Sequence, residues 1–222
     1  MTPMKKTALA ALCALAAFSA GASNANADPM LQIELQAGGS TYTSQQKFSP
    51  LLYSPLSDDM SLGGFSVAGN FGVAKQTPVL DLGSVEIYSG TGGGTIVVTL
   101  SASGFTTPLG AANWMSQFSG NLNGSGTMEL QTYLDTSDTL LGTGTLLSTL
   151  TSTGTPFGIS NVTSASTNGS FALTEVMTIS TDGAALISLD GSIAYVPEPA
   201  SMALLAAGLI GTGVVSRRRK AA

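Results

Sequence analysis

In several short stretches between residues 28 and 196 the apolar side chains recur at every second position, and this alternation constrains the fold more than any other feature of the chain. Successive side chains of a strand point to opposite faces, so the alternation predicts strands with one buried face. No long stretch has the periodicity of an amphipathic helix. Clear strands are predicted within 31–36, 96–100, 127–134, 170–180 and 187–195, and weaker ones within 65–68, 79–88 with a kink at 83–84, and 139–150.

Short clusters of turn-forming residues separate these strands, at 38–39, 61–64, 90–94, 121–126, 168–169 and 182–183. Because Asn-Gly and Asp-Gly suit two-residue hairpin turns, we expect a hairpin at Asp182-Gly183 and a flexible hairpin tip at 90–94. We expect residues 49–60 to form the longest loop, whereas residues 111–117 fit either a short helix or the edge of a strand. The fold class that follows is all-β, an antiparallel β-sandwich with a jelly-roll-like arrangement.

The C-terminal stretch combines three segments with different physical properties. Val196-Pro197-Glu198-Pro199 contains two prolines, which continue neither a strand nor a helix and predict a short, stiff connector. Residues 200–215 carry no charge and would form about 24 Å of helix, slightly less than a ~30 Å hydrocarbon core. A basic cluster that would hold its end in the cytoplasm follows, formed by Arg217, Arg218, Arg219 and Lys220. We therefore predict a single C-terminal hydrophobic helix that spans the membrane.

The order of these segments resembles the PEP-CTERM sorting signal of bacterial exported proteins. The resemblance implies recognition by exosortase, a membrane-embedded cysteine transpeptidase-like enzyme that cuts near the Pro-Glu-Pro motif and releases or re-attaches the ectodomain. It also implies a Gram-negative host that makes exopolysaccharide or biofilm. Stretches 95–106, 130–135 and 171–179 resemble a recurrent PEP-CTERM ectodomain, which implies an extracellular β-sandwich-like domain without catalytic residues. The alternative is an ordinary single-span anchor with a proline linker.

Residues 1–27 have the three parts of a secretory signal peptide. Lys5 and Lys6 precede an apolar stretch, and Ala25 and Ala27 form a small-x-small cleavage site. We therefore divide the chain into a signal peptide (1–27), an ectodomain (28–195) and a sorting signal (196–222). The precursor is expected to be anchored in the inner membrane by one C-terminal span, and the mature protein to be secreted or on the cell surface.

The composition excludes several kinds of chemistry from the predicted mature domain. The chain has no histidine, and its one cysteine, Cys13, lies in the signal peptide. Ser-His-Asp and Cys-His nucleophiles are therefore excluded, together with zinc and copper sites built on His or Cys. Between residues 28 and 196, 12 acidic residues stand against Lys47 and Lys75, which argues against nucleic acid as a partner. We expect no cofactor and no metal; the expected partners are exosortase, the membrane through the C-terminal helix, and exopolysaccharide.

A secreted polysaccharide hydrolase is one alternative function, since it needs only a pair of carboxylates. The available glutamates are Glu34, Glu86, Glu129 and Glu175. Glu175 differs from the others because it shares a face with apolar residues. It must lie at a sheet margin, be paired, or have a pKa raised by burial. Its role is either that of a general acid or that of a structural acid bonded to backbone amides or a lysine.

A calcium-stabilised carbohydrate-binding module is the second alternative. Asp58-Asp59 and residues 135–138 are the best candidates for calcium ligands, although neither matches a known calcium loop. Aromatic side chains could stack on sugars, and Tyr133 is the most interesting because alternation places it on the polar face of its strand. The interpretation that the residues favour remains a non-catalytic protein of the cell surface or extracellular matrix.

Overall fold

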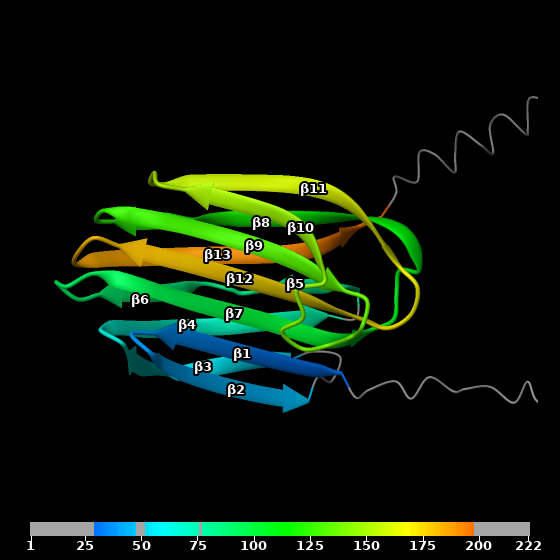
Figure 1. Ribbon diagram of the computed structural model, residues 1–222, viewed down its shortest axis with the longest axis horizontal. Coiled ribbons are helices and arrows are strands. Elements are labelled where there is room, and N and C mark those ends of the chain that lie inside the picture. The colour runs from blue at the N-terminus through cyan, green and yellow to red at the C-terminus, as the bar shows by residue number, and fades with distance from the viewer. Residues whose placement is uncertain (1–28, 48–51, 76, 198–222) are drawn as a thin grey trace, which may run out of the picture.

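The computed structural model describes residues 29–47, 52–75 and 77–197, and of residues 52–59, 70, 71, 73 and 75 it describes the backbone alone. Within these ranges the chain forms thirteen strands, which Figure 1 shows as two layers. Sheet A has the order β10-β9-β12-β7-β1-β2. Its strands are β1 (Met30–Ala37), β2 (Ser40–Lys47), β7 (Gly94–Phe105), β9 (Gly126–Asp135), β10 (Thr145–Ser152) and β12 (Phe171–Thr181).

Sheet B packs on sheet A and has the order β11-β8-β13-β5-β4-β3, with β6 also paired to β13 and β4. Its strands are β3 (Leu52–Leu62), β4 (Phe65–Lys75), β5 (Val79–Asp81), β6 (Val85–Ser89), β8 (Gly110–Asn123), β11 (Phe157–Thr167) and β13 (Ala185–Val196). Every pairing in both sheets is antiparallel. The predicted antiparallel β-sandwich is therefore confirmed.

The core lies between the sheets and is built by the alternation seen in the sequence. On β1, Leu31, Ile33 and Leu35 are buried while the residues between them are not. The largest buried side chains are Trp114, Phe65, Phe118 and Phe171. Within the described ranges, no helix is long and apolar enough to cross a membrane. The helix predicted at 200–215 lies outside those ranges.

The break predicted within residues 79–88 is present and has a local cause. Strand β5 ends at Asp81, and β6 begins at Val85. Between them Gly83 has a φ of +68°, a conformation that a residue with a Cβ rarely adopts. The N–H of Gly83 donates a 2.8 Å hydrogen bond to Oδ1 of Asp81, which fixes the bend between the two strands.

The loop predicted at residues 49–60 is wrong for most of its length. The chain from residue 52 onward forms β3, which pairs with β4. Pro55 lies opposite Asn70 in this pairing, close to two register shifts. Proline is tolerated there because β3 is an edge strand, which needs hydrogen-bond donors on one side only.

Two of the predicted hairpins are also wrong, because their turns connect strands of different sheets. The turn at Asp182-Gly183 joins β12, which lies between β7 and β9 in sheet A, to β13 in sheet B. The stretch at 90–94 likewise joins β6 of sheet B to β7 of sheet A. By contrast, Gly38-Gly39 and Gly63-Gly64 close true two-residue hairpins with positive φ at all four glycines.

Residues 111–117, for which a short helix and a strand edge remained open, belong to β8. This strand lies between β11 and β13, so it is not an edge strand. Trp114 and Phe118 are therefore buried in the core.

The last strand extends to the predicted sorting motif. In β13, Tyr195 and Val196 pair with Trp114 and Asn113 of β8, and the N–H of Tyr195 donates a 2.9 Å hydrogen bond to the carbonyl oxygen of Pro78. The start of β1 and the end of β13 lie at the same end of the sandwich (Figure 1). The folded domain thus ends one residue before Pro197.

Candidate functional site

The predicted sorting and cleavage residues lie at or beyond the edge of the described structure. Val196 is the last residue of β13, and Pro197 follows it as an exposed residue without regular structure. The remaining predicted residues lie outside the described ranges: Glu198 and Pro199, Arg217, Arg218, Arg219 and Lys220, and Ala25 and Ala27. Their assignment stays a prediction as far as the structure is concerned.

The four candidate glutamates do not gather at one place. Glu34 on β1 and Glu129 on β9 lie on the outer face of sheet A, and Glu86 on β6 lies on the outer face of sheet B. Glu175 on β12 points into the core. Strands β7 and β12 separate β1 from β9, and Glu34 aligns with Gln131, two residues from Glu129. At roughly 4.8 Å per strand and 3.4 Å per residue, Glu34 is about 16 Å from Glu129.

Glu175 is the most unusual titratable group in the described structure. Its exposed fraction is 0%, and neither carboxylate oxygen has a hydrogen-bond partner. Thr132 lies opposite it on β9, but the Thr132 hydroxyl bonds across the sheets to Ser116 at 2.7 Å. A Cβ placed on Gly191 of β13 would lie 3.4 Å from Glu175 Oε2. The carboxyl group therefore rests against the backbone of the opposite sheet.

This geometry decides among the environments expected for Glu175. Its strand is the third of six in sheet A, so the residue is not at a sheet margin, and neither carboxylate oxygen has a hydrogen-bond partner within bonding distance among the described residues. Burial raises the pKa of Glu175 well above its ordinary value, and the negative charges of Asp81 and Asp190 raise it further. The backbone of Ile193 acts in the opposite direction. Glu175 is also closed off from solvent, so it cannot act on a substrate in this conformation.

Replacing Glu175 with glutamine should remove a pH-dependent loss of stability. The pKa is raised in the folded state, so the folded domain holds this proton more tightly than the unfolded chain. Stability is complete below the ordinary pKa of glutamate and falls as the pH rises towards the folded-state pKa. In that window the wild type should lose up to about 1.4 kcal/mol per pH unit relative to Glu175→Gln. Thermal unfolding measured over a pH series checks this, with Glu86→Gln as the exposed control; parallel pH profiles for wild type and Glu175→Gln would contradict it.

The acidic stretch 135–138, a candidate calcium loop, uses its carboxylates for hydrogen bonds to the backbone. Oδ1 of Asp135 accepts a 2.7 Å bond from the N–H of Ser137, and Oδ1 of Asp138 accepts one of 2.7 Å from the N–H of Gly104. Among the described residues, no group of three or more acidic, His or Cys side chains could hold a metal ion. The side chains of Asp58 and Asp59 lie outside the description. The described acids therefore shape the loop after β9.

A polar groove lies on the outer face of sheet B. It has a volume of about 330 Å³ and crosses β11, β8 and β13. Its polar side chains come from aligned rows of the sheet, because Gln117 pairs with both Ser160 and Ser192, and Ser119 pairs with both Gly158 and Asp190. The groove is lined by Gln117, Phe118, Ser119, Gly158, Ile159, Ser160, Asp190 and Ser192.

Asp190 gives this polar groove its only charged lining residue. Partial burial raises the pKa of Asp190, and the nearby Asp81 raises it further. Asp81 pairs with Ser192, so it sits diagonally beside Asp190 on the same face, at about 7–8 Å. The groove therefore offers hydroxyl and amide groups around one carboxylate.

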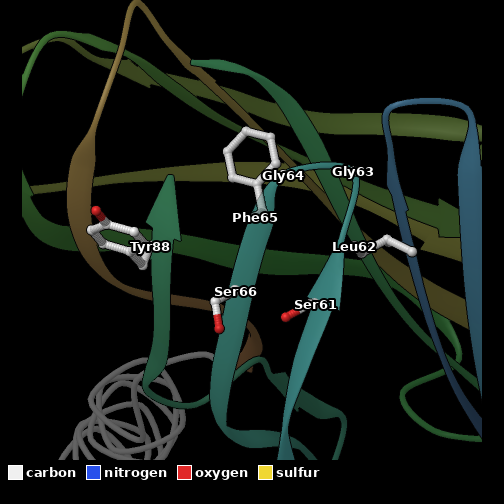
Figure 2. A pocket seen from close by; sticks show the side chains of 7 residues that line it. All are labelled: Ser61, Leu62, Gly63, Gly64, Phe65, Ser66 and Tyr88. Carbon is white, nitrogen blue, oxygen red and sulfur yellow. The ribbon is translucent and has the colours of Figure 1, made fainter. Parts of the chain in front are cut away.

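A second hollow of about 310 Å³ lies on the outer face of sheet B near the β3–β4 turn. Figure 2 shows Tyr88 standing beside Ser66 on the neighbouring strand, with Ser61 on the strand beyond. Tyr88 is 51% exposed and pairs with the exposed Leu186 of β13. Leu186 and Asp190 are four residues apart on one strand, about 13 Å. An aromatic side chain and a polar groove therefore share one face.

Tyr133, the aromatic residue singled out from the sequence, is less exposed than Tyr88. Tyr133 is half-buried, and its hydroxyl donates a 2.7 Å hydrogen bond to Oε1 of Gln131. Trp114 is fully buried, and Tyr53 lies where side chains are not described. Among the side chains that the structure describes, Tyr88 is the aromatic with a large exposed fraction, and its outward position two residues after Glu86 on β6 follows from alternation alone.

Residues 196–220 match the family model of the PEP-CTERM protein-sorting motif. The chain therefore carries the sorting motif expected of an exosortase substrate, and this motif indicates an exported protein that is processed at the cell envelope. The match covers the tail and does not extend to the described domain. No curated protein matches the chain.

Solved structures similar to this chain include two sugar-binding domains and part of a phage protein. TmCBM61, solved with β-1,4-galactotriose, is 11% identical with a TM-score of 0.35, over 60% of this chain and 88% of that one. The N-terminal cellulose-binding domain of Cellulomonas fimi β-1,4-glucanase C is 14% identical with a TM-score of 0.33, over 66% and 98%. The enzymatically active domain of bacteriophage CBA120 tailspike protein 4 is 10% identical with a TM-score of 0.34, over 60% of this chain and 19% of that one. Scores this low carry no argument about ligand or activity.

Proposed function

We propose that the protein is a non-catalytic component of the cell surface or extracellular matrix that associates with exopolysaccharide. The observation that carries this proposal is the PEP-CTERM sorting motif at residues 196–220, which marks an exported exosortase substrate. We also propose that the precursor is anchored in the inner membrane by one C-terminal span, and that the mature protein begins after a signal peptide of residues 1–27. A jelly-roll-like connectivity belongs to the same proposal, supported by the many connections that cross between the sheets.

The positions of the glutamates support a non-catalytic role. Glycoside hydrolases place two carboxyl groups about 5–10 Å apart across a cleft. Glu34 and Glu129 are about 16 Å apart by strand spacing and register, and Glu86 is on the other sheet's outer face. Glu175 is fully buried. None of these four residues forms the pair that such hydrolysis needs.

A polysaccharide hydrolase remains the second candidate because of Asp81 and Asp190. Their diagonal placement at about 7–8 Å falls within the range of inverting hydrolases, and the raised pKa of Asp190 suits a general acid. Against this, Oδ1 of Asp81 accepts the N–H of Gly83, and Asp81 does not line the groove. The arrangement therefore supports binding better than catalysis.

Fractionation of the producing cells tests the proposed function. We expect the protein in the extracellular fraction that contains exopolysaccharide, and we expect Asp190→Asn to leave the polysaccharide chain length unchanged. Retention of all the protein in the cytoplasm would contradict export. Polysaccharide that becomes longer in the Asp190→Asn strain would favour the hydrolase.

A further inference from the structure

We propose that the groove across β11, β8 and β13 is a binding site for a neutral, hydroxyl-rich polysaccharide chain, with Gln117, Ser119, Ser160, Asp190 and Ser192 as its hydrogen-bonding groups. This inference rests on the proposed association with exopolysaccharide and names the residues that would perform it. The proposed site lies on the outer face of sheet B, and its role is separate from that of the sorting motif.

The polar groups of the groove are not used by the fold. Within the described ranges, the side chains of Gln117, Ser119, Ser160, Asp190 and Ser192 form no hydrogen bonds to other residues. Polar side chains nearby on the same strands do form such bonds: Ser164 donates to Oδ1 of Asn113 at 2.6 Å. Five unused hydroxyl, amide and carboxylate groups converge on one groove, where a ligand with many hydroxyl groups can pair with them.

Gly158 keeps the groove open, although the fold does not require a glycine at this position. A Cβ on Gly158 would meet no atom within 4 Å, and its φ lies outside the left-handed region. Glycine in the interior of a strand is normally unfavourable. By contrast, a Cβ on Gly120 of β8 would lie 2.5 Å from the carbonyl oxygen of Ser188, so that glycine is structural. Because Gly158 has no side chain, the space beside Ser119 stays open to a ligand.

The negative charge of the groove favours an uncharged ligand. The groove has one carboxylate, that of Asp190, and no lysine or arginine among its lining residues. Asp81 adds a second negative charge nearby. An anionic polysaccharide would be repelled, whereas sugar hydroxyls can donate hydrogen bonds to the carboxylate oxygens. The ligand class that fits is therefore a neutral polysaccharide.

The exposed pair of Tyr88 and Leu186 lies on the same face and extends the argument to a chain rather than a single sugar. A polymer that crosses the groove can continue along β13 for the roughly 13 Å to this pair. The ring of Tyr88, which is 51% exposed, can then stack on a sugar face. Binding should accordingly require several linked sugar units.

Native electrophoresis of the full-length chain, in gels that contain a polysaccharide, tests the site. The neutral probes are hydroxyethyl cellulose, β-1,4-galactan, dextran and mannan, and carboxymethyl cellulose is the anionic counterpart of the first. We expect at least one neutral polymer to retard the wild type and carboxymethyl cellulose not to. Gly158→Ile should weaken that retardation at least about tenfold in affinity and Gln117→Ala several-fold. Gly92→Ile is the matched control, since Gly92 also has open space and an ordinary φ but lies between β6 and β7.

The outcomes separate the site from the proposed function. No retardation by any neutral polymer would overturn the inference, and so would retardation that Gly158→Ile leaves unchanged. Equal melting temperatures for Gly158→Ile and wild type show that the variant is folded. If Gly158→Ile binds normally while the protein is still released into the exopolysaccharide fraction, the groove is not the site but the proposed function stands. If the protein is not exported at all, the proposed function fails whatever the gels show.

Discussion

Replacing Trp114 with alanine should destabilise the domain more than any other single truncation of its core. Trp114 is fully buried, and its indole N–H donates to the carbonyl oxygen of Ala165 at 3.4 Å. Its ring lies edge-on to Phe171 of sheet A at 5.5 Å between ring centroids, and 6.1 Å from Tyr195. The substitution removes packing between the two sheets and within sheet B. We expect a loss of about 3–5 kcal/mol in the free energy of unfolding, a large share of the roughly 5–15 kcal/mol of a typical domain.

Thermal and urea unfolding measure this effect, which should lower the melting temperature by roughly 10 °C or more. Leu109→Ala is the control, because Leu109 is 65% exposed and its truncation should change the stability by no more than about 0.5 kcal/mol. A Trp114→Ala variant as stable as Leu109→Ala would mean that the sheets do not pack as described.

Replacing Pro197, Glu198 and Pro199 with alanine should abolish release of the protein and leave the domain folded. These residues lie within the stretch that matches the PEP-CTERM sorting motif, so exosortase should no longer recognise the chain. The sheet hydrogen bonds end at Tyr195 and Val196, so the substitutions remove no pairing from β13. We expect the variant to remain in the membrane fraction with an unchanged melting temperature once it is extracted.

Immunoblots of membrane and medium fractions make the comparison. A double replacement of the exposed Thr106 and Thr107, in the connection between β7 and β8, is the control and should be released like the wild type. Normal release of the Pro-Glu-Pro variant would show that the motif is not the sorting signal.

Several central strands could be predicted from the sequence, whereas the edge strands β2 and β11 could not. Strands such as β1, β7 and β12 have a partner on each side and one face in the core, so their apolar residues alternate. Strand β2 lies at an edge of sheet A and has no fully buried residue. Strand β11 lies at an edge of sheet B and has only one, Thr167. A strand with few buried side chains needs no alternation of apolar residues, so the sequence did not indicate β2 and β11 as strands.

Turn chemistry predicts that the chain reverses but not which strand it joins. Gly38-Gly39 joins two strands of one sheet, while Asp182-Gly183 carries the chain from one sheet to the other. The difference lies in the partners already taken: β12 is flanked by β7 and β9, so β13 must pair elsewhere. Such competition depends on pairings far apart in the sequence.

The candidate site, too, could be predicted from the sequence only in part. Glu175 could be singled out because a carboxylate on the apolar face of a strand is unusual. The structure shows it fully buried, with no hydrogen-bond partner for either oxygen. The groove could not be predicted, because Ser160, Gln117 and Ser192 become neighbours only through the registers of β11, β8 and β13. Gly158 has no local signature that distinguishes it from a turn-forming glycine.

The intact mass of the form released into the medium tests the central claim most directly, namely that this is an exported protein cut at its C-terminal sorting motif. We predict a mass that lacks both the signal peptide of residues 1–27 and the segment 202–220. The cut then falls close behind Val196, where the last strand ends. A released product that still carries Arg217 would contradict the claim.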